Sequence, residues 1–151
     1  VLRIYGDGMR AELQQLIDSL GITSSCILEP TVPNIVEKYC ESSVFVLSSR
    51  FEGFGMVITE AMSCGVPPIS FDCPCGPKDI IDDGKDGLLV ENGNIEELAE
   101  KIAYLIENEK VRMDMGKQAC MNVQRFQMEN IVKQWKGLFE ELTNNSQQPQ
   151  N

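Results

Sequence analysis

Glu52-Gly-Phe-Gly-Met-Val-Ile-Thr-Glu60 is the stretch that most constrains the fold of this chain. The apolar, β-branched segment Val44–Leu47 before it predicts a buried strand. The segment Met56–Cys64 contains no helix-breaking residue and predicts a helix that ends at Gly65. We therefore expect Glu52 in a strand-to-helix loop, with the start of the helix directly behind it.

The predicted start of this helix suits an anionic group, because its first backbone N–H groups lack intrahelical partners and carry partial positive charge. Gly53 and Gly55 have no side chain, so a ligand can approach the backbone closely. Glu60 lies about one turn into the helix and leans back toward its start. Two carboxylates therefore flank the anion site and can accept hydrogen bonds from sugar hydroxyls. A nucleotide sugar, which carries both phosphate and hydroxyls, satisfies the whole arrangement.

Short apolar runs alternate with amphipathic stretches, which predicts an α/β fold with a parallel sheet and helices on both faces. The expected strands are Leu2–Tyr5, Cys26–Leu28, Val44–Leu47, Pro68–Phe71 and Leu88–Val90. The expected helices are Met9–Leu20, Pro33–Glu41, Gly55–Cys64 and Ile95–Glu107, with a further apolar helical face in Gln127–Leu142. We expect one domain over residues 1–142 and a disordered polar tail over residues 143–151, which has no apolar anchor.

The stretch from Glu52 to Glu60 resembles the E-x7-E signature of retaining glycosyltransferases of the B-type (GT-B) fold, especially glycosyltransferase family 4, the glycosyl transferases group 1. The resemblance covers residues 1 to about 142 and implies the C-terminal, Rossmann-like half of such an enzyme, a three-layer α/β sandwich. Four further blocks carry it: Tyr5-Gly-Asp-Gly8, Ser42-Ser-Val-Phe-Val-Leu-Ser-Ser49, Glu60-Ala-Met-Ser-Cys-Gly-Val-Pro67 and Ile80-Ile-Asp-Asp-Gly-Lys-Asp-Gly-Leu-Leu-Val90.

The resemblance also implies a role for each residue of the signature. It implies that Glu52 is the catalytic carboxylate and contacts hydroxyls of the donor sugar, and that Glu60 binds the ribose hydroxyls. It places the base near Thr31 and Val32. It assigns the diphosphate, or its neighbouring sugar oxygens, to backbone N–H groups of Gly53, Phe54, Gly55, Met56 and Val57.

The implied activity is transfer of a hexose from a UDP- or GDP-linked donor, with retained anomeric configuration and with no metal or other cofactor. The expected acceptor is a glycan or a lipid-linked acceptor, and the run Phe71-Asp-Cys-Pro-Cys-Gly-Pro77 resembles bacterial members that build surface polysaccharides. The family's diphosphate-binding arginine and lysine, its central strand and its acceptor-binding domain lie upstream of Tyr5-Gly-Asp-Gly8 and are absent here. Because Val1 is also not a start methionine, we expect a fragment without transfer activity of its own.

Composition excludes several partners. The net charge of −10, from 13 basic and 23 acidic residues, argues against nucleic acid and against anchoring on an anionic membrane. No apolar run approaches the ~20 residues that span a bilayer, and no signal peptide is visible. We expect a cytoplasmic protein, or a peripheral position at the inner membrane face for the full-length protein.

Metal and thiol chemistry has little support in the sequence. There is no histidine, and the six cysteines show no C-x2-C spacing. Cys73-Pro-Cys75 is the one close pair and cannot complete a tetrahedral site by itself. Asp82-Asp83 fits a turn before Gly84 better than a metal pair, and Lys78 could meet an anion.

Two other functions stay open. Gly6-x-Gly8-x-x-Ala11 follows a predicted strand and opens a predicted helix, which formally matches the dinucleotide fingerprint of an NAD-dependent enzyme. Asp7 would, however, lie inside that phosphate loop and repel a pyrophosphate. The other alternative is a non-catalytic nucleotide-binding module, and a nucleotide-sugar epimerase of the same fold is a lesser one.

Overall fold

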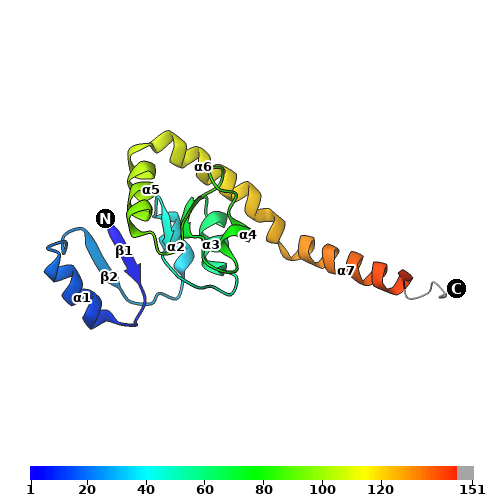
Figure 1. The fold of residues 1–151 in the computed structure, drawn as a ribbon, viewed down its shortest axis with the longest axis horizontal. Coiled ribbons are helices and arrows are strands. Elements are labelled where there is room, and N and C mark those ends of the chain that lie inside the picture. Colours follow the sequence, from blue (N-terminus) through cyan, green and yellow to red (C-terminus); the bar gives the residue numbers. More distant parts are fainter. Residues whose placement is uncertain (146–151) are drawn as a thin grey trace. The chain divides into compact units, whose positions relative to one another are not determined.

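Every strand pairing in the computed structural model, which describes residues 1–145, is parallel (Figure 1). The chain divides into two units, Val1–Ile35 and a larger one that begins at Val36. In the first unit, β1 (Leu2–Tyr5) pairs with β2 (Cys26–Glu29), and α1 (Arg10–Ser19) connects them. The prediction of an α/β fold with parallel strands is thus confirmed, and the strands are divided between two sheets.

The second unit carries the other strands and the remaining helices. Its sheet has the order β3-β4-β5, and each connection between neighbouring strands carries a helix, as parallel pairing requires. After α2 (Ile35–Cys40) the elements are β3 (Phe45–Leu47), α3 (Met56–Ser63), β4 (Pro68–Phe71), α4 (Pro77–Ile80), β5 (Leu88–Val90), α5 (Ile95–Glu107), α6 (Glu109–Asn122), the 3-10 helix η1 (Val123–Phe126) and α7 (Met128–Asn145).

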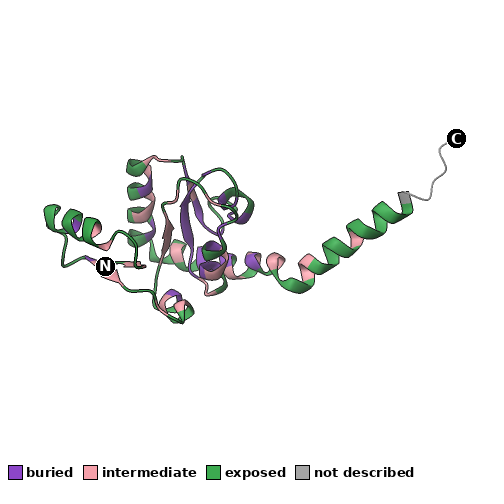
Figure 2. Ribbon diagram, turned by 90° about the horizontal axis from the view of Figure 1, so that it is seen from below, coloured by how far each residue is buried: buried purple, intermediate pink, exposed green. Residues whose placement is uncertain are grey.

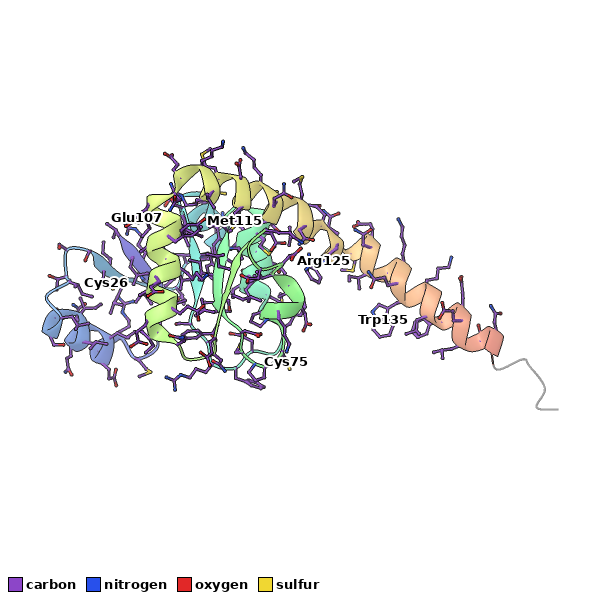
Figure 3. All side chains as sticks on the ribbon, turned by 45° about the horizontal axis from the view of Figure 1, so that its top comes forward. Cys26, Cys75, Glu107, Met115, Arg125 and Trp135 are labelled. Carbon is purple, nitrogen blue, oxygen red and sulfur yellow. The ribbon has the colours of Figure 1, made fainter. Side chains whose placement is uncertain are left out.

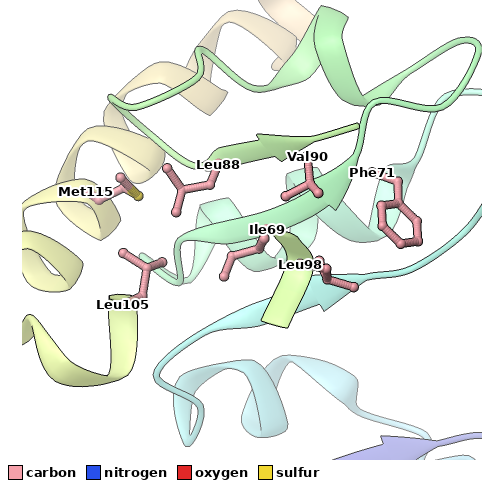
Figure 4. Packing of buried hydrophobic residues seen from close by; sticks show 7 residues of the cluster. All are labelled: Ile69, Phe71, Leu88, Val90, Leu98, Leu105 and Met115. Carbon is pink, nitrogen blue, oxygen red and sulfur yellow. The ribbon is translucent and has the colours of Figure 1, made fainter. Parts of the chain in front are cut away.

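One face of the three-stranded sheet packs against α5 and α6. Side chains along a strand alternate between the two faces, so every second residue of β4 and β5 points to this side. Leu98 and Leu105 of α5 lie two turns apart and meet the sheet from one stripe of the helix. The buried cluster consists of Ile69, Phe71, Leu88, Val90, Leu98, Leu105 and Met115 (Figure 4).

The opposite face of the sheet is covered by α3, α4 and the end of α6. Phe45, Leu47 and Leu89 of the strands contact this second cluster. Its buried members are Ile58, Met62, Ile80, Ile81, Ala119 and Val123. Helices therefore cover both faces of the sheet, as the alternation of elements predicts.

The sequence does not predict α4, α6 or η1. The buried residues of α6 include Gly116, which packs against the turn after α3. A Cβ atom on Gly116 would lie 2.2 Å from the carbonyl oxygen of Gly65. A close backbone contact of this kind fixes α6 on α3, and hydrophobic periodicity does not reveal it.

The long helix predicted in Gln127–Leu142 is confirmed as α7, and it extends further than predicted. The predicted disordered tail is wrong for Thr143–Asn145, which are helical, while residues 146–151 lie outside the described residues. The Thr143 hydroxyl donates to the Phe139 carbonyl at 3.0 Å, so this polar side chain is satisfied within the helix. No α7 residue of described burial is buried (Figure 2), and Trp135 is 55% exposed (Figure 3).

None of the helices within residues 1–145 combines the length and the apolar character that crossing a bilayer requires. The prediction that residues 1–142 form one domain stays a prediction, because each of the two units is described by itself.

Candidate functional site

The carboxyl ends of β3, β4 and β5 lie at one edge of their sheet, because the strands are parallel. The connections that leave this edge are residues 48–55, 72–76 and 91–94. Asn92 Nδ2 donates to the Arg50 carbonyl at 3.2 Å, which joins the last of these loops to the first. Ligands of open parallel sheets bind beyond this edge. Glu52 and the start of α3 therefore lie where a ligand is expected.

The first backbone N–H groups of α3 have no acceptor within the helix. Gly55 precedes the helix with a φ of 89°, which glycine adopts without strain. The Ile58 N–H donates to the Gly55 carbonyl at 2.9 Å and closes the first turn. The N–H groups of Met56 and Val57 come before the first hydrogen bond of the helix, and both residues are exposed. The first turn contains no acidic side chain. The role that the resemblance implies for the backbone of residues 53–57 stays a prediction.

The loop before α3 is held in place by the residues around it. Gly76 packs so closely against this loop that a Cβ atom on it would lie 2.0 Å from the Phe54 carbonyl oxygen. The ring of Phe54 meets that of Phe126 edge to face at 5.5 Å. The guanidinium carbon of Arg125 lies 4.4 Å from the centre of the Phe126 ring, and the Arg125 side chain donates to the Ile80 carbonyl at 2.6 Å. The backbone of the Gly53–Gly55 loop is therefore positioned before any ligand arrives.

Glu60 is held by a residue that the sequence analysis missed. The hydroxyl of Tyr39 in α2 donates to Glu60 Oε2 at 3.3 Å. Tyr39 is only 7% exposed, and its ring meets Phe45 edge to face. Burial, together with the charge of Glu60 and this hydrogen bond, raises the pKa of Tyr39 to about 12. Spacing along the chain gives no signal for this contact, because it depends on the packing of α2 against α3.

Glu52 lies half-buried in the loop after β3, close to Cys73. Burial, reinforced by the nearby negative charge of Glu52, raises the pKa of the Cys73 thiol. Cys73 is buried and Cys75 is exposed, so the two thiols of this pair lie in different environments. Within residues 1–145, no group of three or more His, Cys, Asp or Glu side chains could hold a metal ion.

The first unit contains Thr31 and Val32, the residues predicted to lie near the base. Thr31 is exposed and donates to the Asp7 carboxylate through both its hydroxyl and its N–H. These hydrogen bonds, the hydroxyl's first, lower the pKa of Asp7. Arg10 donates to the carbonyls of Gly6, Leu28 and Glu29. The charged groups of the Gly6–Ala11 loop are thus occupied by contacts within the unit, which favours a structural turn over a dinucleotide site.

The acidic turn before β5 is a structural feature. Asp86 is 1% exposed and accepts hydrogen bonds from the Asp82 N–H at 2.8 Å and from the Asn122 side-chain amide. Asp83 accepts from the Leu89 N–H at 2.9 Å. The turn predicted at Asp82-Asp83 is confirmed, and the sequence analysis missed the buried carboxylate that organises it. Lys78 is exposed on α4.

Glu52, the Gly53–Val57 backbone and Glu60 all belong to the second unit, while Thr31 and Val32 belong to the first unit. An arrangement of a helix start between two carboxylates can bind an anionic group that also carries hydroxyls.

Comparison with known proteins agrees with the family resemblance described from the sequence. The sequence profile of the glycosyl transferases group 1 matches residues 1–120. An exopolysaccharide phosphotransferase of Streptomyces coelicolor is 38% identical over 150 residues, which are 98% of this chain and 16% of that protein. A poly(ribitol-phosphate) alpha-N-acetylglucosaminyltransferase of Staphylococcus aureus is 33% identical over 141 residues, 90% of this chain and 28% of that protein.

Solved structures agree with the sequence comparisons. The crystal structure of HepE from Anabaena in complex with UDP superposes with a TM-score of 0.84 at 25% identity, over 92% of this chain and 40% of that one. The chain spans less than half the length of these similar proteins.

Proposed function

The chain belongs to the family of glycosyl transferases group 1, and we propose that it is the donor-binding part of a retaining hexosyltransferase that uses a nucleotide sugar. Its α/β fold, shared with the UDP complex of HepE, is that of the Rossmann-like C-terminal half of a GT-B glycosyltransferase. Membership of family 4 and retention of the anomeric configuration are part of the proposal, and they rest on the signature at Glu52 and Glu60.

The observation that carries the proposal is the position of Glu60. Its carboxylate lies one turn behind a helix start that can accept an anion, and Tyr39 holds it there by a hydrogen bond of 3.3 Å. A carboxylate repels phosphate, so it has no favourable role beside a site for phosphate alone. It becomes favourable when the ligand places hydroxyls next to it, because charge-assisted hydrogen bonds are stronger than neutral ones.

The proposal assigns a role to each residue of the site. Backbone N–H groups of residues 53–57 bind the diphosphate or its neighbouring sugar oxygens, and Glu60 binds the ribose hydroxyls. Glu52 contacts hydroxyls of the donor sugar, and its negative charge stabilises the positive charge that develops on the sugar as the bond to the diphosphate breaks. Thr31 and Val32 lie near the base.

The proposal also specifies the substrates of the reaction. The donor is a UDP- or GDP-linked hexose, and no other cofactor is required. The acceptor is a glycan or lipid-linked acceptor of cell-surface polysaccharide synthesis, in the cytoplasm or at the inner face of the membrane. The Staphylococcus aureus relative is a poly(ribitol-phosphate) alpha-N-acetylglucosaminyltransferase, which supports an acceptor of this kind. The UDP bound in the HepE structure supports a uridine donor.

Calorimetry with UDP and with UDP-glucose on the 151-residue chain tests the two carboxylates separately. Glu60→Gln is expected to weaken both ligands at least about tenfold, because it removes a charge-assisted hydrogen bond. Glu52→Gln is expected to weaken UDP-glucose and to leave UDP unchanged, because Glu52 contacts the sugar. Glu107→Gln is the matched control, since this exposed glutamate ends α5, about 20 Å along the helix from the site edge.

Equal affinity of the wild-type chain and Glu60→Gln for UDP would refute the nucleotide assignment. Loss of UDP affinity in Glu52→Gln would make Glu52 a nucleotide-binding residue and contradict its place beside the sugar. A titration with NAD belongs to the same series, and NAD binding that Asp7→Ala alters would favour the dinucleotide alternative.

A further inference from the structure

The loops that follow β1 and β2 leave the two-stranded sheet side by side. The register of these parallel strands places Tyr5, the last residue of β1, opposite Glu29, the last residue of β2. The Gly6 N–H donates to the Glu29 carbonyl at 3.2 Å and continues the pairing by one residue. Asp7 and Thr31, each two residues beyond its strand, therefore meet at the carboxyl edge of the sheet, where ligands of open parallel sheets bind.

The carboxylate of Asp7 holds Thr31 with both of its oxygens. Asp7 Oδ2 accepts from the Thr31 hydroxyl, and Asp7 Oδ1 accepts from the Thr31 N–H at 3.4 Å. One carboxylate thus contacts the side chain and the backbone of the same residue, which fixes the orientation of the Thr31 peptide group. Both residues are exposed, so this contact adds little to the core of the unit.

Thr31 is the least restricted backbone position in its loop. The rings of Pro30 and Pro33 fix the φ angles of these two residues. Val32 precedes a proline, which confines it to extended conformations. Thr31 is neither a proline nor followed by one. Asp7 therefore holds the position at which this stretch of the chain is most able to turn.

A second side chain fixes the backbone beneath the loop. Arg10 donates to the carbonyls of Gly6 at 3.1 Å, Leu28 at 3.0 Å and Glu29 at 2.8 Å. These carbonyls lie at the ends of the two strands, so the start of each loop is held without Asp7. Replacement of Asp7 should therefore release Thr31 and leave the sheet intact.

We propose that Asp7 is a positioning residue of the nucleotide site, which holds the Thr31 peptide group in the orientation that receives the base. The role toward the base rests on the proposed function, which places the base near Thr31 and Val32, whereas the hold on Thr31 does not. A released loop has to be ordered when the ligand binds, which lowers the affinity.

The proposal also predicts how the site distinguishes bases. Uracil and cytosine exchange hydrogen-bond donor and acceptor at ring nitrogen N3 and at the neighbouring exocyclic group. Peptide groups held in one orientation match one of these patterns and leave polar groups unpaired with the other, so they discriminate between the two bases. A loop that turns freely at Thr31 discriminates less.

The test uses the 151-residue chain and compares Asp7→Ala with Asp7→Asn. In Asp7→Asn, the amide oxygen accepts from the Thr31 N–H and the amide nitrogen donates to the hydroxyl oxygen, so the contact is kept without the charge. Asp18→Ala is the matched control. Asp18 is exposed in the same unit and accepts from the Gln14 amide at 2.8 Å, so its replacement removes the same charge and one side-chain contact.

Amide hydrogen exchange at Thr31, followed by NMR, is expected to be faster in Asp7→Ala than in the wild type, Asp7→Asn and Asp18→Ala. Calorimetry is expected to show UDP affinity about tenfold lower in Asp7→Ala, the effect of ordering about one backbone residue. The preference for UDP over CDP should decrease in the same variant. Pyrophosphate has no base, so its affinity should not fall, and Asp7→Asn should keep most of the UDP affinity.

Unchanged exchange at Thr31 in Asp7→Ala overturns the hold on the loop. Equal losses of UDP and pyrophosphate affinity in Asp7→Ala, or equal losses of UDP affinity in Asp7→Ala and Asp7→Asn, overturn the positioning role. If the wild-type chain does not bind UDP, the proposed function fails, and the exchange rate still decides whether Asp7 holds Thr31.

Discussion

Gly76 fixes the loop that precedes α3, and its replacement by alanine gives a quantitative test of that role. Its φ of 90° and ψ of −75° are close to the rare γ-turn with positive φ, which costs a residue with a side chain about 1–3 kcal/mol. A Cβ atom would also lie 2.0 Å from the Phe54 carbonyl oxygen and 2.5 Å from its carbon. Relief of this overlap requires the loop to move, which adds about 1–3 kcal/mol. Gly76→Ala should therefore lose about 2–6 kcal/mol of unfolding free energy.

Gly93→Ala is the matched control. Gly93 has a φ of 88° and belongs to the same unit, but nothing lies within 4 Å of a Cβ atom at that position. Its substitution measures backbone strain alone, about 1–3 kcal/mol. Urea unfolding followed by circular dichroism compares the two, because the exposed Trp135 is a poor fluorescence probe of the core. Equal losses in both variants would refute the claim that Gly76 clamps the loop.

Three further predictions follow from contacts near Glu60 and in the acidic turn. Tyr39→Phe should weaken UDP binding about fivefold in calorimetry. The raised pKa of Tyr39 favours the neutral phenol in the folded state, so the stability of the wild type should fall as the pH rises from about 10 to about 12. The urea midpoints of Tyr39→Phe should lack this part of the fall. Glu60→Gln should bind inorganic pyrophosphate at least as well as the wild type while it binds UDP less well, and equal losses for both ligands would contradict the assigned role. Asp86→Ala should lower the unfolding free energy by about 2–4 kcal/mol in urea titrations, because it leaves the Asp82 N–H and the Asn122 amide without their acceptor.

The elements with a clear apolar period were predictable from the sequence. The bounds of β4, β5 and α5 agree with the predicted ones, because the residues of β4 and β5 are nearly all buried and α5 meets the sheet along one stripe. The start of α3 was predictable for a different reason. Gly55 indicates a turn, and the residues after it contain no helix breaker, so the sequence predicts a helix that starts there.

Features that depend on contact between distant segments were not predictable. In the sequence, Gly76 is an ordinary loop glycine, and only the fold shows its contact with Phe54. Gly116 lies in a stretch for which the sequence predicts no helix, and its contact with Gly65 likewise appears only in the fold. Tyr39 reads as a core residue of a short helix, and its bond to Glu60 arises only when α2 and α3 pack together. Periodicity and spacing describe one element at a time, so they miss positions whose role is set by a second element.

In the proposed function, the selectivity of the site comes from hydroxyls of the ligand and not from cationic side chains. Arg125 lies against Phe126 and donates to carbonyls of Asn122, Asp79 and Ile80, so its charge is used to fix α4. The start of α3 then attracts phosphate through its N–H groups, while the carboxylates of Glu52 and Glu60 repel it. A bare phosphate gains the first interaction and suffers the second. A ligand that places hydroxyls between its phosphates and the carboxylates turns both repulsions into hydrogen bonds, so the spacing of the two glutamates around the helix start favours a nucleotide sugar over simple anions.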